Sequence, residues 1–216
     1  MGSAEESGLI VPLGQWVIEK ACAELATWSR LPWACGVKLA VNVSPREFHH
    51  PDFVRHVVAV VDRTGADPRQ LMLEFTESTL LVDIDDVVAK MTALKARGIG
   101  FAIDDFGTGY SSLSYLKHLP LDQLKIDRSF VHDLGVDGSN TTIAQAIIAL
   151  GKSLGLVVVA EGVETVGQRT VLQRLGCDVF QGYLFGAPAP AADLGHRAFA
   201  GEPQATAGER ASTAIQ

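Results

Sequence analysis

Residues 101–112 read FAIDDFGTGYSS, an apolar run that ends in two aspartates and a glycine-rich loop. Uninterrupted apolar runs are typical of parallel strands that are covered on both faces. Similar short runs recur on both sides of this one, and they alternate with segments whose apolar residues repeat every three to four positions. This alternation predicts an α/β fold in which helices cover a parallel sheet.

The pattern places the expected elements along the chain. We expect six strands, at Val37–Val43, Leu71–Phe75, Ile99–Ile103, Leu121–Ile126, Leu156–Ala160 and near Val179. We expect helices at Pro12–Trp28, Asp52–Asp62, Asp83–Ala96, Ser111–Lys117, Thr141–Leu154 and Thr165–Leu175. From about Gly195 the periodicity stops and the composition shifts to Ala, Gly, Thr, Glu and Gln, so residues 195–216 are expected to be a disordered tail.

Composition limits the functional classes. The 216 residues are 47% hydrophobic and carry a net charge of −7, which fits one globular domain and argues against binding of a nucleic-acid polymer or an anionic membrane. The three cysteines form no CxxC pair, and there is no apolar run of about 18 residues. We therefore expect a cytoplasmic protein.

Each expected strand delivers a polar residue to its carboxyl end. These residues are Asn42, Glu74, Asp104 with Asp105, Lys125, Glu161 and Gln181. In a parallel α/β fold these ends lie on one side, where the loops carry function. A lone carboxylate after a strand is usually a helix N-cap or a solvated loop residue, and we assign Asp52, Asp83 and Asp127 to that class.

Convergent carboxylates need another explanation, because they repel one another and lose solvation unless cations neutralise them. An amide oxygen with several carboxylates, and without histidine at any strand end, favours Mg²⁺ or Mn²⁺ over Zn²⁺. Two such ions are commonly used for attack of water on a phosphodiester. Lys125 would then orient the water or neutralise developing charge; the simpler alternative is a surface lysine at a sheet edge.

Several segments together resemble the EAL-domain cyclic-di-GMP phosphodiesterases of bacteria. They are Asn42–Ser44, Glu74–Ser78, Asp104–Leu113, Lys125–Phe130, Glu161–Thr165 and Gln181–Tyr183. The resemblance runs from about Ala4 to Pro190 in the correct order. It implies a modified (β/α)₈ barrel that hydrolyses cyclic-di-GMP to pGpG with two Mg²⁺ or Mn²⁺ ions.

The resemblance also implies roles for individual residues. Asn42, Glu74 and Asp104 would bind the first metal, and Asp104 with Asp105 would bind the second. Lys125 would hold the attacking water, and Glu161 would act on a water at the metals. Gln181 would complete the polar shell, and Glu77 would anchor the loop from Phe106 to Ser111. A homodimer, with sensory or GGDEF-type domains upstream, is implied as well.

One departure from the family is large. The Glu-Ala-Leu motif, with an arginine that contacts phosphate, should precede everything present here, and the sequence has no Glu-Ala-Leu. We therefore expect residues 1–194 to form an EAL domain without its first two strands, an incomplete TIM-like barrel with six of eight strands. Its activity is expected to be impaired. The alternative is a non-catalytic receptor for cyclic-di-GMP or a protein-interaction module.

Overall fold

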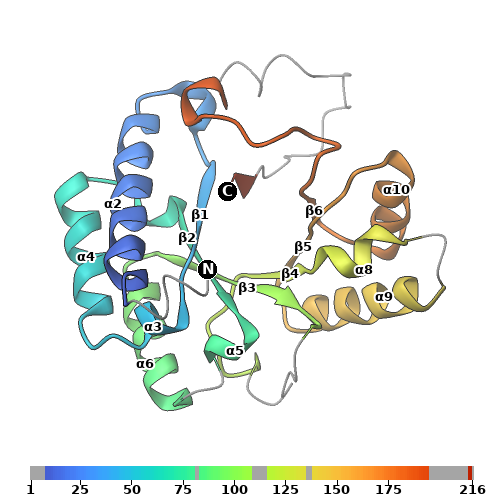
Figure 1. The fold of residues 1–216 in the computed structure, drawn as a ribbon, viewed down its shortest axis with the longest axis horizontal. Coiled ribbons are helices and arrows are strands. Elements are labelled where there is room, and N and C mark those ends of the chain that lie inside the picture. The colour runs from blue at the N-terminus through green and yellow to red at the C-terminus, as the bar shows by residue number, and fades with distance from the viewer. Residues whose placement is uncertain (1–7, 81–82, 109–115, 135–137, 195–213, 216) are drawn as a thin grey trace.

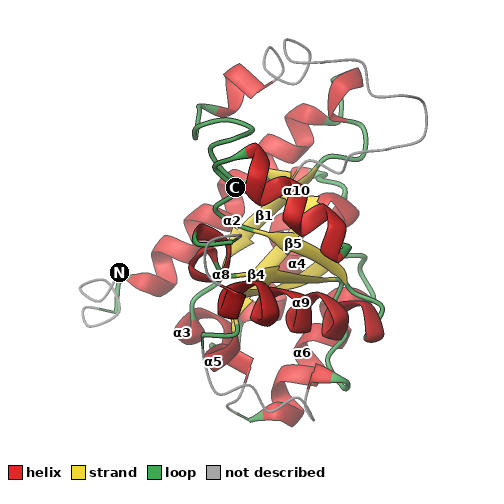
Figure 2. Cartoon of the chain, turned by 90° about the vertical axis from the view of Figure 1, so that its right-hand side faces the viewer, coloured by secondary structure: helices red, strands yellow, loops and turns green. Residues whose placement is uncertain are grey.

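The computed structural model describes residues 8–80, 83–108, 116–134, 138–194 and 214–215. Strands and helices alternate along these residues, and the helices lie around the outer side of the curled sheet (Figures 1 and 2). The strands are β1 (Lys38–Asn42), β2 (Leu71–Thr76), β3 (Gly100–Phe106), β4 (Gln123–Ile126), β5 (Val157–Ala160), β6 (Val179–Phe180) and β7 (Ala214–Ile215).

The helices are α2 (Ile10–Trp28), α3 (Pro45–Phe48), α4 (Phe53–Thr64), α5 (Glu77–Leu80), α6 (Ile84–Lys95), α8 (Arg128–His132), α9 (Gly138–Ser153) and α10 (Val166–Leu175). In the described part of the chain, the five long helices alternate with the strands as the sequence predicts, and three short helices (α3, α5 and α8) were not predicted. Short 3₁₀ helices span Pro32–Ala34 and Pro68–Gln70. The helix expected at Ser111–Lys117 falls mostly on residues outside the described part of the chain.

The sheet is parallel throughout, and its order is β6-β5-β4-β3-β2-β1-β7. Strands β1 to β6 are therefore neighbours in space in the same order as in the sequence, which confirms the six parallel strands that the alternating pattern predicts. They form a curled half-barrel (Figure 1). The seventh strand comes from the end of the chain and pairs with the first half of β1, where Lys38 lies opposite Ala214 and Leu39 opposite Ile215.

The central strands are buried because helices cover them. All residues of β4, and all of β2 except Thr76, are buried, as the apolar runs of the sequence predict. The core is one cluster between the sheet and the helices on its outer side, with Phe48, Phe75, Phe101 and Met91 among its fully buried side chains. This packing holds the strand ends in place, so polar groups at those ends occupy defined positions.

Candidate active site

Strand β3 is longer than predicted, and it contains Asp104 and Asp105 rather than ending before them. The pairing of β3 with β4 shifts register between Ile103 and Phe106, as at a β-bulge, and Asp105 has a left-handed φ of 52°. Successive side chains of a regular strand point to opposite faces, and a bulge changes that direction. The irregularity therefore lets two consecutive aspartates serve the same site.

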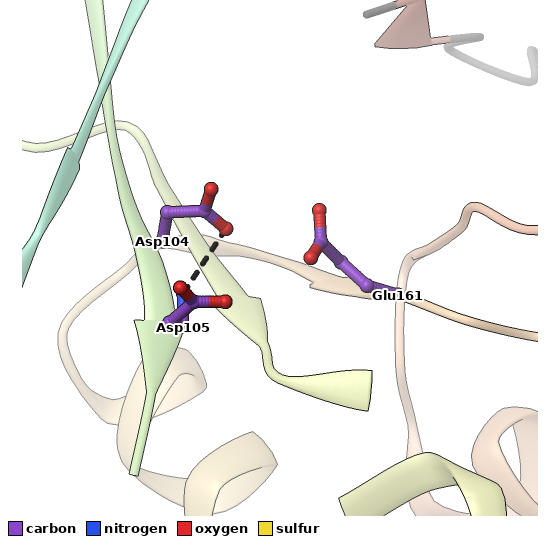
Figure 3. Close-up of side chains that lie close together, drawn as sticks. All are labelled: Asp104, Asp105 and Glu161. Atoms are coloured by element: carbon purple, nitrogen blue, oxygen red, sulfur yellow. Dashed lines mark hydrogen bonds between the residues drawn. The ribbon is translucent and has the colours of Figure 1, made fainter. Parts of the chain in front are cut away.

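The carboxylates of Asp104, Asp105 and Glu161 form a group in which one oxygen of each lies within 4.8 Å of the others. Figure 3 shows the two aspartates on β3 and Glu161 facing them from the end of β5. The backbone N–H of Asp105 donates to Oδ1 of Asp104 over 3.0 Å, which fixes the Asp104 side chain. Three oxygen donors at this spacing suit a hard divalent cation.

Lys125 lies at the centre of the acidic side chains. Its Nζ lies 2.7 Å from Glu74 Oε2, 2.6 Å from Glu161 Oε1 and 3.3 Å from Asp104 Oδ1, and the side chain is 1% exposed. Burial disfavours the ammonium, but the carboxylates of Glu74, Glu161 and Asp104 outweigh burial and raise the pKa of Lys125 above its ordinary value. The group is therefore a charged lysine, not the surface lysine of the simpler alternative.

Two other carboxyl groups in the cluster are perturbed. Burial raises the pKa of Glu161 to about 7; Lys125 opposes the shift and the charge of Asp104 adds to it. Burial, the charge of Asp104 and a hydrogen bond to Asp127 raise the pKa of Asp105. A divalent cation bound here would oppose both shifts, because its positive charge favours the ionised form of nearby carboxyl groups.

The remaining predicted residues lie at neighbouring strand ends. Asn42 pairs in register with Glu74 at the end of β1, and it is exposed. Gln181 follows β6, next to Glu161, and its Oε1 is buried without a hydrogen-bond partner in the described part of the chain. Glu77, at the start of α5, accepts a hydrogen bond of 2.7 Å from the Gly107 N–H, just beyond the aspartate pair.

Asp127 has more contacts than we assigned to it. As predicted, it is an N-cap: its side chain accepts from the Ser129 N–H at the start of α8. It also hydrogen-bonds to Asp105, so it orients one of the site carboxyls. Its position directly after Lys125-Ile126, at a strand end, was a signal of this second contact that the N-cap interpretation did not use.

Comparison with known proteins identifies the family to which the chain is similar. The family model described as "EAL domain" matches residues 1–188. The chain is 46% identical over 194 residues to the bifunctional diguanylate cyclase/cyclic di-GMP phosphodiesterase MucR of Pseudomonas aeruginosa, covering 88% of this chain and 28% of MucR. It thus spans about a quarter of the length of the curated relatives it matches.

Solved structures agree with the sequence matches. The PaMucR phosphodiesterase in complex with c-di-GMP superposes with a TM-score of 0.86 at 46% identity, covering 89% of this chain and 78% of that chain. The manganese/cy-diGMP complex of Klebsiella pneumoniae BlrP1 at pH 9.0 gives a TM-score of 0.70 at 34% identity, covering 81% of this chain and 45% of that chain. The chain therefore belongs to the EAL domain family.

Proposed function

We propose that this chain is a cyclic-di-GMP phosphodiesterase domain that uses two divalent metal ions, Mg²⁺ or Mn²⁺, to hydrolyse cyclic-di-GMP to linear pGpG. The observation that carries the proposal is the bulge in β3, which brings Asp104 and Asp105 together opposite Glu161, beside the buried ammonium of Lys125. A structural role alone does not account for several acids that gather at the carboxyl ends of different strands.

The donor set suits the metals. Asn42, Glu74 and Asp104 would hold the first ion, and Asp104 with Asp105 would hold the second. Oxygen donors are what Mg²⁺ and Mn²⁺ prefer, and the carboxylates of Asp104, Asp105 and Glu161 already converge. When bound, the two ions supply electrostatic stabilisation of the charge that develops on the phosphate oxygens.

The protein's own residues would handle the water and its proton. Lys125, fixed by three carboxylates, would hold the attacking water in line with the phosphorus. Glu161 would take the proton of that water as general base. The new P–O bond forms as the bond from phosphorus to the O3′ of the neighbouring ribose breaks, and O3′ takes a proton from solvent and leaves as a hydroxyl.

Two further parts of the proposal come from the family. We propose that the domain acts as a homodimer in the cytoplasm, within a longer signalling protein that has sensory or GGDEF-type domains. The hydrogen bond from Gly107 to Glu77 supports a role of Glu77 in holding the loop after β3. No helix in the described ranges is long and apolar enough to cross a membrane.

The test incubates the purified chain with cyclic-di-GMP and Mn²⁺ or Mg²⁺ and measures pGpG by chromatography. The Asp104→Ala variant is the control. Product above that control supports the proposal, and no difference from it contradicts catalysis by this chain. The 216 residues contain no Glu-Ala-Leu, so low turnover is expected. Binding of cyclic-di-GMP without turnover would instead favour the alternative of a non-catalytic receptor.

A further inference from the structure

The loop that carries Glu161, between β5 and α10, is held by the side chain of Gln168. This residue lies in the first turn of α10 and is 7% exposed. Its Oε1 accepts hydrogen bonds from the Glu164 N–H over 2.8 Å and from the Thr165 N–H over 2.9 Å. The Thr165 hydroxyl accepts from the Gln168 N–H in return, which completes a capping box at the start of α10. The loop therefore enters α10 in a fixed direction.

Gln168 also joins the loop to α8, and the capping box does not require this contact. Its Nε2 donates to the carbonyl of His132, the last residue of α8, over 3.0 Å. A capping box uses only the acceptor oxygen at this position, so a glutamate would serve it equally well. The amide N–H of a glutamine is needed only for the contact with α8. That donor therefore has a role beyond the start of α10.

The loop also lies against the first residue of α8. Gly162 has a left-handed φ of 66°, and a Cβ there would lie 2.7 Å from the Cβ of Arg128, so glycine is what permits this approach. The Glu161 N–H donates to the Ile126 carbonyl, at the end of β4, over 3.2 Å. The loop is thus fixed against the end of β4 and against both ends of α8.

Helix α8 begins at the acidic group. Its N-cap, Asp127, hydrogen-bonds to Asp105 of β3. Strand β4 lies between β3 and β5 in the sheet, and α8 follows β4. The separation of the Asp105 and Glu161 carboxylates therefore depends on how the loop after β5 packs against α8.

We infer that Gln168 is a positioning residue, which holds Glu161 in place opposite Asp105 by joining the Glu161 loop to the end of α8 (Figure 3). The inference rests on the proposed function, from which the role of Glu161 comes. Gln168 acts through Glu161. A shift of about 1 Å in a group that must be aligned for the reaction can lower turnover about 100-fold. Loss of the contact with His132 should therefore affect the chemistry at the acidic group.

The first test is the Gln168→Glu variant, assayed for pGpG formation in Mn²⁺ at pH 8. A glutamate carboxylate keeps the acceptor for the Glu164 and Thr165 N–H groups, but it offers no donor to the His132 carbonyl. We expect kcat to fall about 10- to 100-fold, as is typical when an outer partner of a metal site is removed. KM should stay within about twofold, because Glu161 acts in proton transfer and not in substrate binding.

The matched control is Thr165→Val, which removes the other half of the capping box. It leaves the hydrogen bond from Gln168 to His132 in place. Loss of an N-cap destabilises a helix, so Thr165→Val should melt at least as low as Gln168→Glu in EDTA. Its kcat should nevertheless stay within about twofold of wild type. The pair therefore separates the position of Glu161 from the stability of α10.

A second readout does not depend on turnover. Mn²⁺ affinity is measured from the electron paramagnetic resonance signal of the free ion, for wild type and both variants. The carboxylates of Asp104, Asp105 and Glu161 converge on one place, so a displaced Glu161 should weaken Mn²⁺ binding. We expect a loss of about 10-fold or more in Gln168→Glu, and no more than about twofold in Thr165→Val.

The outcomes separate this inference from the proposed function. Losses of kcat and Mn²⁺ affinity in Gln168→Glu that are no greater than those in Thr165→Val would overturn the inference and leave the proposed function intact. If wild type binds Mn²⁺ without forming pGpG, hydrolysis by this chain is refuted, and the Mn²⁺ affinities alone decide the inference. A wild-type chain that neither binds Mn²⁺ nor forms pGpG would overturn both.

Discussion

Lys125 is a buried ammonium group that three carboxylates surround. Removing one member of a buried charge cluster leaves the others uncompensated, which typically costs about 3–5 kcal/mol. The charge that Lys125 supplies in the metal-free protein is also charge that a bound cation could replace. With metal ions bound as proposed, the residue would therefore link the stability of the domain to the metal content of its site.

We predict that Lys125→Met melts well below wild type in EDTA, and that Mn²⁺ raises the melting temperature of the variant more than that of wild type. Hydrolysis of cyclic-di-GMP should fall about 100-fold or more. Lys90→Met is the control, because Lys90 pairs with Asp86 on α6, away from the site. If Mn²⁺ raised the melting temperature of Lys125→Met and of wild type equally, the result would contradict the idea that lysine and metal both neutralise the same carboxylates.

Glu47 is a second buried acid, on the helix that follows β1. It is 3% exposed, and its Oε1 has no hydrogen-bond partner in the described part of the chain. It packs against Gly14 of α2, where a Cβ would lie 2.0 Å from Glu47 Oε2. Burial raises the pKa of Glu47 to about 7 from an ordinary value of 4.5.

This shift predicts a pH dependence of stability. Above pH 4.5 the unfolded chain ionises Glu47 while the folded chain keeps the proton, so stability falls as pH rises, until the folded group ionises near pH 7. The loss amounts to about 3 kcal/mol at 1.36 kcal/mol per pH unit. Glu47→Gln should reduce this fall and leave the part that the raised pKa of Glu161 contributes over the same pH range, as measured by urea unfolding at several pH values. A variant that loses stability between pH 5 and 7 as wild type does would contradict this assignment.

The sequence predicted which acidic side chains and which lysine come together, but not the geometry of the cluster. The run of polar residues at strand ends identified Glu74, Asp104, Lys125 and Glu161, because parallel strands all end on one side of a sheet. The bulge that brings Asp105 beside Asp104 has no signature in the sequence, since Asp105 is not a glycine and yet has a positive φ. Pairing with the neighbouring strand imposes such a conformation. The spacing of apolar residues along the sequence carries no information about that pairing.

At the scale of elements, one arrangement of side chains recurs in the sheet. Asp122, directly before β4, accepts a hydrogen bond of 2.8 Å from the Phe101 N–H of β3 and pairs with Lys95 at the end of α6. Asp178, directly before β6, accepts one of 2.9 Å from the Val158 N–H of β5 and pairs with Lys152 at the end of α9. Each aspartate thus joins a helix end to two strands.

We predict that Asp122→Ala lowers the free energy of unfolding by about 1–3 kcal/mol, because it leaves the N–H of Phe101 without its acceptor. Asp122→Asn keeps an acceptor oxygen and loses only a half-exposed ion pair, which contributes little. Denaturant unfolding of the two variants measures the difference. Equal losses in both would show that the charge pair, and not the backbone hydrogen bond, is what stabilises the strand.

The long elements were predictable from the sequence and the short ones were not. Helices α2, α4, α6, α9 and α10 begin and end within a few residues of the predicted ranges, because each shows several repeats of an apolar face. Helices α3 and α5 have four residues each and α8 has five, too few for such a repeat. Capping residues such as Ser44, whose side chain accepts from the Glu47 N–H, were their remaining signal.

At the scale of the whole molecule, strand β1 is paired unequally on its two edges. It pairs along most of its length with β2, but on its other edge only Lys38 and Leu39 have partners in a described strand. Strand edges without partners favour association between molecules. The two residues of β7 therefore matter for how the chain behaves in solution.

We predict that replacing residues 213–216 by Gly-Ser-Gly-Ser increases self-association, as measured by light scattering across protein concentrations. Glycine and serine pair poorly as strands, so the replacement keeps chain length while weakening β7. The same replacement at residues 203–206, within the tail but before β7, is the control. Unchanged association in the first variant would show that β7 does not protect the edge of β1.

The pairing of β7 with β1 also constrains the order of events during synthesis. Strands β1 to β6 pair in the order in which they leave the ribosome, each joining the edge made just before it. Strand β7 is translated after β1 to β6, yet its partner is β1. At translation rates of about 5–20 residues per second, the nascent sheet carries that edge of β1 without this partner for many seconds before β7 can be added.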